Sequence, residues 1–313
     1  MRALVLTRPS TLELRAVPDA VAAHGQVVVK VEAAGIGGGE IFQLHNPTGR
    51  TFPSIMGHGI VGTARGLRVA VDPITACERC AFCTTGRRQH CARRKMIGFD
   101  SDGGFAELVA VPENNLHHLP DSMSWEQATF IEPFANAVHA WKVAEAHSAV
   151  TVGVIGAGAI GLGVVAYAAQ QNIATIAVSE LADSRRRVAL ALGATSVGQG
   201  LTEQHDIVFD AVGTARSRAA AVTHTTAGGT VVLLGLESAN PGFDAIDVVR
   251  RELRIQASYV YLGDEFAEAI ALASTTQSDW IANYGFENVQ EIIDDFSVGD
   301  YEVVRAALRL RSQ

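Results

Sequence analysis

From residue 150 onward, short apolar runs alternate with segments whose apolar residues recur at helical spacing. Helical stretches such as Leu162–Gln170 and Ser184–Leu192 separate β-branched or apolar runs of strand length. Five of these runs are pronounced and a sixth, Thr195–Val197, is weaker; the five are Val150–Ile155, Thr175–Val178, Ile207–Val212, Thr230–Leu234 and Leu253–Tyr259. Alternation of strands and helices predicts an α/β fold, with a parallel sheet covered by helices on both faces.

The first 147 residues follow a different pattern. Strand-like runs at Gln26–Glu32, Arg68–Val71 and Phe105–Val111 alternate with Gly and Pro turns. This pattern predicts a β-rich domain of the barrel type.

Two further segments connect these regions. A helix from about Ser124 to Ala146 is expected to bridge them, and the tail from Asp264 mixes helices with a short strand that we expect to pack on the first region. We therefore predict a β-rich domain at 1–147, an α/β domain at 148–262 and a return segment at 263–313.

Composition narrows the range of partners. The chain has 313 residues, of which 48% are apolar and 19% charged, and its net charge of −8 argues against nucleic acid and anionic membranes as partners. The uncharged stretch 149–169 is long enough to cross a bilayer, but its glycines and β-rich start favour a strand, a turn and a buried helix. The N-terminal apolar run is too short for a signal peptide, so we expect a cytoplasmic protein.

All four cysteines of the chain lie in one loop, with the spacing C-x2-C-x2-C-x7-C: Cys77, Cys80, Cys83 and Cys91. Thiolates at this spacing can converge on one tetrahedral Zn²⁺. Four sulfur ligands leave no open coordination position, so this zinc is expected to brace the fold and not to react. Disulfides are the alternative, which the two-residue gaps and the absence of a secretion signal disfavour.

A glycine-rich segment, VIGAGAIG, directly follows a predicted strand and opens a helix. Its Gly156, Gly158 and Gly161 form a G-x-G-x-x-G motif. Gly156 permits a tight turn, Gly158 lets the backbone approach a pyrophosphate at the helix N-terminus, and Gly161 allows the helix to pack closely on the strand. The motif in this setting predicts a dinucleotide-binding site.

A carboxylate follows at the distance that such a site requires. Glu180 ends the second strand, 19 residues after Gly161. A carboxylate there hydrogen-bonds the ribose hydroxyls and repels a 2′-phosphate, which favours NAD over NADP. Ser179 and the arginines at 185–187 point the other way, because arginines can hold a phosphate.

Together these motifs resemble the medium-chain dehydrogenases/reductases, in the zinc-dependent alcohol and polyol dehydrogenase branch. The resemblance covers essentially the whole chain: the four-cysteine loop, MGHGIVG, IEPFANAVHA, VIGAGAIG, DIVFDAVG and GGTVVLLGL occur in the family's order. It implies a Rossmann domain inserted in a GroES-like catalytic domain, and homodimers or homotetramers. It also implies that Asp210 in VFDAVG and the turn Val231–Gly235 lie along the nicotinamide half of the cofactor. The predicted cofactor-binding residues are Gly156, Gly158, Ala159, Ile160, Gly161, Glu180, Arg185, Val212 and Gly235.

The residues that hold the family's reactive zinc are largely replaced. The family carries a Cys in G-I-C-G-[ST]-D, the His and often the Glu of G-H-E, and a further Cys or Glu. Here Gly37 stands at the cysteine position and Gly59 at that Glu, while Gly39 replaces the hydroxyl residue of the proton relay. Two candidate ligands remain, His58 and Glu132, where a catalytic zinc usually has three. We predict that a second zinc is absent or weakly bound.

The surviving polar residues suggest an acid/base centre without metal. By resemblance, Glu40 lies behind His58, where it would orient the imidazole and raise its basicity. A carboxylate–imidazole pair facing nicotinamide can act as a general acid/base, and Glu132 could bind a substrate hydroxyl or share the proton. The predicted catalytic residues are therefore His58, Glu132 and Glu40. The alternative is that His58 is a packing histidine and that Glu132, before Pro133, only caps a helix.

Three functions remain open from the sequence. The first is an NAD(H)-dependent oxidoreductase that moves hydride between the cofactor and a hydroxyl or carbonyl of a small polar substrate, such as an alcohol, polyol or sugar. The second is a metal-free reductase of an activated C=C bond, as in an enone or quinone, which a hydrophobic cleft around Phe42 would suit. The third is a non-catalytic protein that binds NAD(H) as a sensor.

Overall fold

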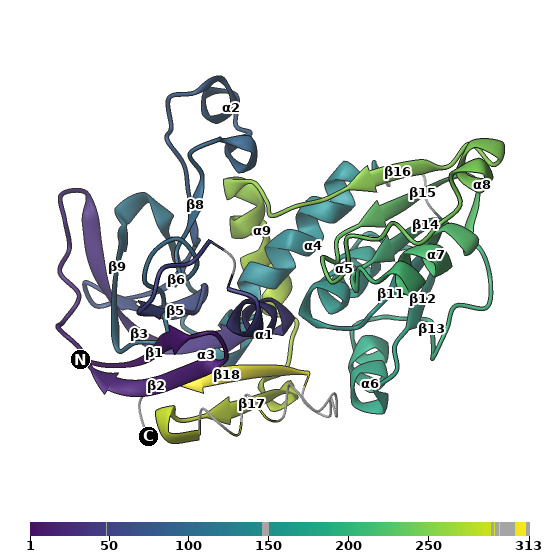
Figure 1. The fold of residues 1–313 in the computed structure, drawn as a ribbon. Helices are drawn as coiled ribbons and strands as arrows, with labels where there is room; N and C mark the ends of the chain where they lie inside the picture. Colours follow the sequence, from purple (N-terminus) through teal and green to yellow (C-terminus); the bar gives the residue numbers. More distant parts are fainter. Residues whose placement is uncertain (48, 146–149, 289–290, 292–293, 295–303, 311–313) are drawn as a thin grey trace. The chain divides into compact units, whose positions relative to one another are not determined.

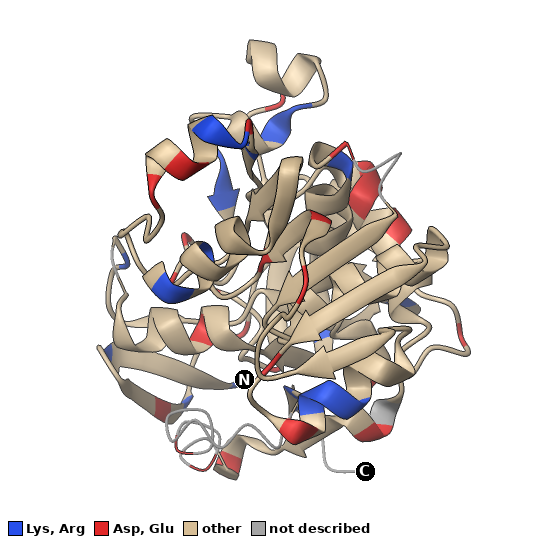
Figure 2. Ribbon diagram, turned by 90° about the vertical axis from the view of Figure 1, so that its right-hand side faces the viewer, with Lys and Arg blue, Asp and Glu red and all other residues tan. Residues whose placement is uncertain are grey.

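The computed structural model describes the chain apart from residues 48, 146–149, 289–290, 292–293, 295–303 and 311–313 (Figure 1). The described residues form two compact units, Met1–Glu132 with Leu262–Gln313, and Pro133–Tyr261. In Figure 2, basic and acidic segments are interspersed along the described ribbon. Among the described residues, every helix is too short or too polar to span a membrane.

The second unit contains one six-stranded sheet whose strand pairs are all parallel. In sheet order its strands are β13 (Ser196–Gly198), β12 (Thr175–Ser179), β11 (Thr151–Ile155), β14 (His205–Asp210), β15 (Thr225–Leu233) and β16 (Arg254–Ala257). The order reverses direction at β11, as in a doubly wound Rossmann sheet. The predicted parallel α/β fold is confirmed, and strands predicted from apolar runs coincide with these to within a few residues.

Helices cover this sheet: α4 (Ile131–Val143), α5 (Ala159–Gln170), α6 (Asp183–Ala191), α7 (Ala215–Thr223) and α8 (Ala245–Arg250). Within the second unit, α4 and α5 pack very closely, because a Cβ on Gly163 would lie 2.8 Å from Ala137 Cβ and from Phe134 Cδ1. Trp141 of α4 stacks on Phe209 of β14, with ring centroids 5.9 Å apart. The apolar face of α4 is thus buried against α5 and the sheet of the second unit.

The predicted single helix from Ser124 to Ala146 is wrong. The structure has α3 (Trp125–Ala128) and then α4, which starts at Ile131; Ala146 lies outside the described residues. Pro133 has no amide hydrogen, so the bond that would join it to the Thr129 carbonyl is missing. The amides of Thr129 and Phe130 instead bond three residues back, which ends α3. The compact units divide after Glu132, whereas the predicted β-rich domain runs to residue 147; those domain bounds stay a prediction.

The first unit is built on a seven-stranded sheet. Its order is β10 (Leu116–His118), β6 (Leu67–Val71), β5 (Gly59–Ala64), β3 (Gln26–Ile36), β18 (Arg305–Arg309) and β17 (Ile281–Tyr284), with β9 (Leu108–Pro112) also paired to β3. Smaller sheets join β1 (Arg2–Arg8) to β2 (Thr11–Ala16) and β4 (Ser54–Ile55), and β7 (Ile74–Thr75) to β8 (Lys95–Met96). Inward side chains of β1, β3, β5 and β9 form its core, as the predicted β-rich domain requires.

The return segment completes this unit. It consists of α9 (Gly263–Ala273), β17 and β18, and β18 pairs antiparallel with β3, placing Ala307 opposite Gly35. This pairing joins the tail to the sheet of the first unit, and the return segment at 263–313 stays a prediction. Among the described residues, this unit also contains α1 (Gly38–His45), α2 (Ala81–Thr84) and short 3₁₀ turns at Arg88–His90, Glu113–Asn115, Ser278–Trp280 and Phe286–Asn288.

Candidate functional site

The junction of β3 and α1 places a buried carboxylate at the start of a helix. Glu40 is the third residue of α1, and its side chain is 4% exposed. Its Oε2 accepts a hydrogen bond from the amide of Gly37 at 3.0 Å. The free amides and the dipole of a helix N-terminus both favour a negative charge at this point. The remaining oxygen, Oε1, is left to face another group.

That group is His58, which precedes β5. Its Nδ1 lies 2.7 Å from Glu40 Oε1, and its Nε2 lies 3.4 Å from Glu132 Oε2. The side chain of His58 is 12% exposed, and its ring meets the edge of Phe99 at a centroid distance of 4.9 Å. The structure therefore brings together the three residues that the sequence suggested as a catalytic group.

Electrostatics keep this imidazole protonated. Burial by itself would lower the pKa of His58, but the carboxylates of Glu40 and Glu132 outweigh it and raise the pKa to about 10. Burial would likewise raise the pKa of Glu40, but the charge of His58 more than compensates, and the pKa of Glu40 falls below its ordinary value. At neutral pH the pair is an imidazolium and a carboxylate.

The donor set around His58 does not fit a three-ligand zinc. Glu40 faces Nδ1 and Glu132 faces Nε2, on opposite sides of the ring, so the three cannot converge on one ion as they lie. His45, whose position in the sequence is close enough to Glu40 to supply another ligand, has its Nδ1 2.8 Å from Ser10 Oγ instead. Among the described residues, only the four cysteines bring three or more ligand atoms together.

Sequence reasoning missed a further charged residue at this centre, Arg305 at the start of β18. Its side chain is buried, 4% exposed, and its guanidinium lies 5.6 Å from the centroid of the Phe130 ring. Burial lowers the pKa of Arg305, while the charges of Glu40 and Glu132 oppose that shift. The signal available in the sequence was weak: one of two arginines in a mainly apolar run, VVRAALRL, far along the chain from Glu40.

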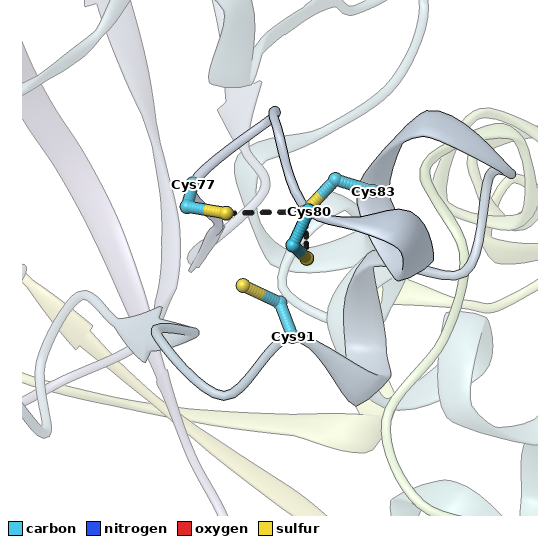
Figure 3. A group of neighbouring side chains, drawn as sticks. All are labelled: Cys77, Cys80, Cys83 and Cys91. Atoms are coloured by element: carbon cyan, nitrogen blue, oxygen red, sulfur yellow. Dashed lines mark hydrogen bonds between the residues drawn. The ribbon is translucent and has the colours of Figure 1, made fainter.

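The four-cysteine loop has the geometry of a metal site (Figure 3). The four Sγ atoms all lie within 4.8 Å of one another, with Cys77 and Cys83 3.9 Å apart and Cys80 and Cys83 3.5 Å apart. Tetrahedral Zn–S bonds of about 2.3 Å require sulfurs about 3.8 Å apart, whereas a disulfide requires about 2.05 Å. The backbone amides of Arg79 and Cys80 lower the pKa of the Cys77 thiol to about 5, which favours the thiolate that binds metal.

The glycine motif follows β11 and opens α5. Gly156 has φ +89°, in the left-handed region, and a Cβ on it would lie 2.5 Å from Val212 Cγ2. A Cβ on Gly161 would lie 1.9 Å from the Gly156 carbonyl oxygen, so the helix can pack on the turn only without a side chain there. Gly158 precedes α5, and a Cβ on it would meet nothing within 4 Å. This open side is where a pyrophosphate can approach the backbone.

Glu180 lies beside this turn. Its Oε2 accepts a hydrogen bond from the Ala157 amide at 2.8 Å, and its Oε1 accepts from the amides of Leu181 and Ala182 at 2.7 and 3.0 Å. The carboxylate is thereby fixed next to the glycine motif. Arg186 donates to the carbonyl oxygens of Glu180 and Leu181 and pairs with Asp183.

The ends of β14 and β15 complete the predicted nucleotide residues. The Asp210 side chain accepts hydrogen bonds from the amides of Val212 and Gly213, both at 3.0 Å. Gly235 lies so close to this turn that a Cβ on it would be 2.0 Å from the Val212 carbonyl carbon. Gly156, Val212 and Gly235 are therefore neighbours at the carboxyl ends of the parallel strands, where dinucleotide folds bind their ligands.

Family models match both parts of the chain. The model of the alcohol dehydrogenase GroES-like domain matches residues 23–121, and that of the zinc-binding dehydrogenases matches residues 159–275. These matches follow the same division into a β-rich and an α/β part as the structure.

Whole-chain comparisons agree. The starvation-sensing protein RspB of Escherichia coli (strain K12) is 30% identical over 82% of this chain and 83% of its own length. D-altritol 5-dehydrogenase of Agrobacterium fabrum (strain C58) is 30% identical over 88% of each chain. A crystal structure of the alcohol dehydrogenase rspB from E. coli CFT073 with NADH superposes with a TM-score of 0.90 at 25% identity, covering 99% of both chains. The chain belongs to the zinc-type alcohol and polyol dehydrogenases of the medium-chain dehydrogenase/reductase superfamily.

Proposed function

We propose that this protein is an NAD(H)-dependent oxidoreductase that transfers hydride between nicotinamide and a hydroxyl or carbonyl group of a small polar substrate. Family membership supports the reaction class. The observation that carries the proposal is His58, whose Nδ1 is held 2.7 Å from a buried carboxylate while Nε2 lies on the side of Glu132. A positioned imidazole of this kind can hold or move the proton that accompanies hydride transfer.

When bound, nicotinamide supplies or accepts the hydride. In carbonyl reduction, the His58 imidazolium donates a proton from Nε2 to the oxygen that becomes the alcohol, and Glu40 stabilises the charge at Nδ1. In alcohol oxidation, neutral His58 takes the proton back. Glu132, 3.4 Å from Nε2, accepts a hydrogen bond from the substrate hydroxyl or from one beside it. His58 and Glu132 are the proposed catalytic residues, and Glu40 positions His58.

The substrate is proposed to be an alcohol, polyol or sugar-like compound. A buried carboxylate such as Glu132 selects hydroxyl groups, because it can only accept hydrogen bonds when ionised. D-altritol 5-dehydrogenase, a relative over most of the chain, is named for a polyol. Reduction of an activated C=C bond remains the alternative, supported by the 45% exposed Phe42 on α1. A panel of polyols against enones separates the two.

A non-catalytic NAD(H) sensor is the second candidate. The glycines at positions 37 and 59 support it, since they replace family metal ligands, and one relative is named a starvation-sensing protein. NADH binding without turnover across alcohols, polyols, sugars and enones would favour this function over the enzyme.

We propose NAD in preference to NADP. The fixed carboxylate of Glu180 places negative charge beside the glycine motif, where it accepts ribose hydroxyls and repels a 2′-phosphate. Arg186 donates to two carbonyl oxygens and pairs with Asp183. A positive charge at Arg185 is the feature of the sequence that would favour a phosphate. Dissociation constants for NADH and NADPH measured by fluorescence titration test this choice, and tighter NADPH binding would reverse it.

The proposed metal content is one structural zinc per chain, held by Cys77, Cys80, Cys83 and Cys91, with a catalytic zinc absent or weak because of the donor set at His58. The protein is further proposed to act as a homodimer or homotetramer, with a small-molecule substrate as its partner.

The decisive experiment for the reaction is His58→Ala. Loss of a group that acts on the transition state lowers kcat by about 10²- to 10³-fold. NADH binding should stay within about twofold, because His58 lies outside the glycine motif. His45→Ala is the matched control, since this histidine is exposed and its Nδ1 lies 2.8 Å from Ser10 Oγ. Unchanged turnover in His58→Ala would exclude the proposed chemistry.

A further inference from the structure

The space beside the His58 centre is shaped by glycines. A Cβ on Gly35 would lie 2.1 Å from Arg305 Nη2, and one on Gly59 would lie 3.2 Å from the same atom. A Cβ on Gly37 would lie 3.3 Å from Arg305 Nη1 and 3.7 Å from Glu40 Oε2. A guanidinium therefore fills the volume that three side chains would need. Gly35 and Gly59 face each other across β3 and β5, so this volume is built into the sheet.

The same geometry explains two replacements at once. Positions 37 and 59 are those where the family carries a zinc-binding Cys and a Glu. A Cβ at position 37 or 59 would lie 3.3 or 3.2 Å from the guanidinium, closer than most Cβ contacts, so a side chain there requires Arg305 to shift. The absence of side chains at positions 37 and 59 and the burial of Arg305 are thus linked, because the guanidinium occupies the space beside both glycines.

Arg305 lies where it can compensate the charge of two buried carboxylates. Glu40 and Glu132 are two carboxylates, 4% and 8% exposed, on either side of one imidazole. Two buried carboxylates so close together are costly without a compensating cation. Arg305 interacts electrostatically with both, and a guanidinium stays charged at every physiological pH. In a metal-dependent centre a divalent cation would supply this charge.

We propose that Arg305 is a positioning residue for the reaction described above: its guanidinium, seated over Gly35, Gly37 and Gly59, is the resident cation that holds Glu40 and Glu132 around His58 where relatives carry metal ligands. The inference rests on the proposed function, because it assigns the arginine to the same centre. Arg305 acts through the two carboxylates and needs no contact with substrate.

The test uses the whole 313-residue chain, purified in the presence of zinc. Arg305→Ala should lower kcat by about 10²-fold, by loss of a preorganised charge at the centre. Arg305→Lys keeps a charge and should retain about tenfold more activity than Arg305→Ala. Guanidinium chloride at millimolar concentration should rescue Arg305→Ala, because the ion fits the vacated space, whereas sodium chloride or urea at the same concentration should not.

Arg309→Ala is the matched control. Arg309 lies on the same strand and pairs with Glu126 at 3.3 Å, a carboxylate that the proposed reaction does not use, so kcat should stay within about twofold. If Arg305→Ala does not fold, Gly35→Ala takes its place. Its methyl group would displace the guanidinium while leaving the charge in the chain, and kcat should fall at least tenfold.

Two results would overturn the inference. One is a wild-type kcat in Arg305→Ala. The other is a loss of kcat that guanidinium does not restore, together with an equally inactive Arg305→Lys. The two proposals fail separately. Full activity in Arg305→Ala together with an inactive His58→Ala removes only the role of Arg305, whereas an active His58→Ala removes the proposed reaction itself.

Discussion

The four-cysteine loop and the His58 centre, both in the first unit, are the two places where the family holds a metal, and they differ in what they present to one. The loop offers four sulfur atoms within 4.8 Å of one another. The His58 centre offers carboxylates on opposite nitrogens of one imidazole, and a buried arginine nearby. The loop can neutralise a dication from all sides, whereas the His58 centre already contains its own cations.

The difference shows that a metal site requires ligand atoms that converge on one point, as well as suitable residue types. Cys77 to Cys91 are close in sequence, so one loop brings all four ligands together. Glu40, His58 and Glu132 come from three separate elements, and with glycines at positions 37 and 59 their atoms face the histidine instead of a common point. The following predictions test this contrast, starting with the largest effect.

Removing one thiolate of the four-cysteine loop should have the largest effect, on zinc binding and on the stability of the fold. Cys91→Ser should release the bound zinc and lower the free energy of unfolding by about 4 kcal/mol when free zinc is a thousandfold above its Kd. Elemental analysis should find one zinc per wild-type chain and none in the variant, with a lower Tm by calorimetry. Thr85→Ser, in the same loop, is the control. Two tightly bound zinc ions in the wild type would contradict the contrast between the two centres.

Removing a charge from the His58 centre should affect catalysis more than folding. Glu40→Gln loses the carboxylate that holds Nδ1 and should lower kcat by about 10- to 100-fold, the usual cost of losing such an orienting partner. Zinc content should stay at the wild-type value. Glu113→Gln removes an exposed carboxylate paired with Arg65 and should leave kcat unchanged. Equal kinetics in the two variants would show that Glu40 does not orient His58.

The pH dependence should follow His58. Because its pKa is raised to about 10, the imidazolium dominates at neutral pH, so carbonyl reduction should hold its rate up to about pH 10 and then decline. Alcohol oxidation needs the neutral ring and should accelerate as pH rises toward 10. The same ion pairs stabilise the fold fully below the ordinary pKa of 6.5 and lose that effect as pH rises through about 10. Stopped-flow measurement of the reduction and oxidation rates as a function of pH tests this dependence. A rate change with its midpoint near pH 6.5 would rule out the paired imidazolium.

The smallest effect is expected in the second unit, far from either metal position in the sequence. Glu180→Gln keeps the shape of the side chain but removes its charge, and should reduce the preference for NADH over NADPH by about tenfold, since a hydrogen bond to a charged group contributes about 1.5 kcal/mol. Glu203→Gln, at a solvent-facing position, should leave the preference unchanged. Titration of both coenzymes against both variants gives the ratio directly.

Local patterns in the sequence determined most of the architecture. The parallel sheet followed from apolar runs separated by helical segments, and the nucleotide turn followed from Gly156, Gly158 and Gly161, because each glycine answers a steric demand set within a few residues. The cysteine cluster followed from its spacing. The sequence also suggested that Glu40, His58 and Glu132 belong together, through their resemblance to family motifs.

Tertiary structure alone decided what surrounds His58. Whether Glu40 and Glu132 share a ligand position or flank the ring depends on how β5, α1 and α4 begin, and no local pattern encodes that. Arg305 joins them only because β18 pairs with β3, a contact between distant parts of the chain. The break between α3 and α4, by contrast, has a local cause in Pro133 and in the backbone bonds of Thr129 and Phe130. Spacing in the sequence determines the contacts between residues that are close along the chain. Contacts between charged residues from distant strands are determined only when the sheet has formed.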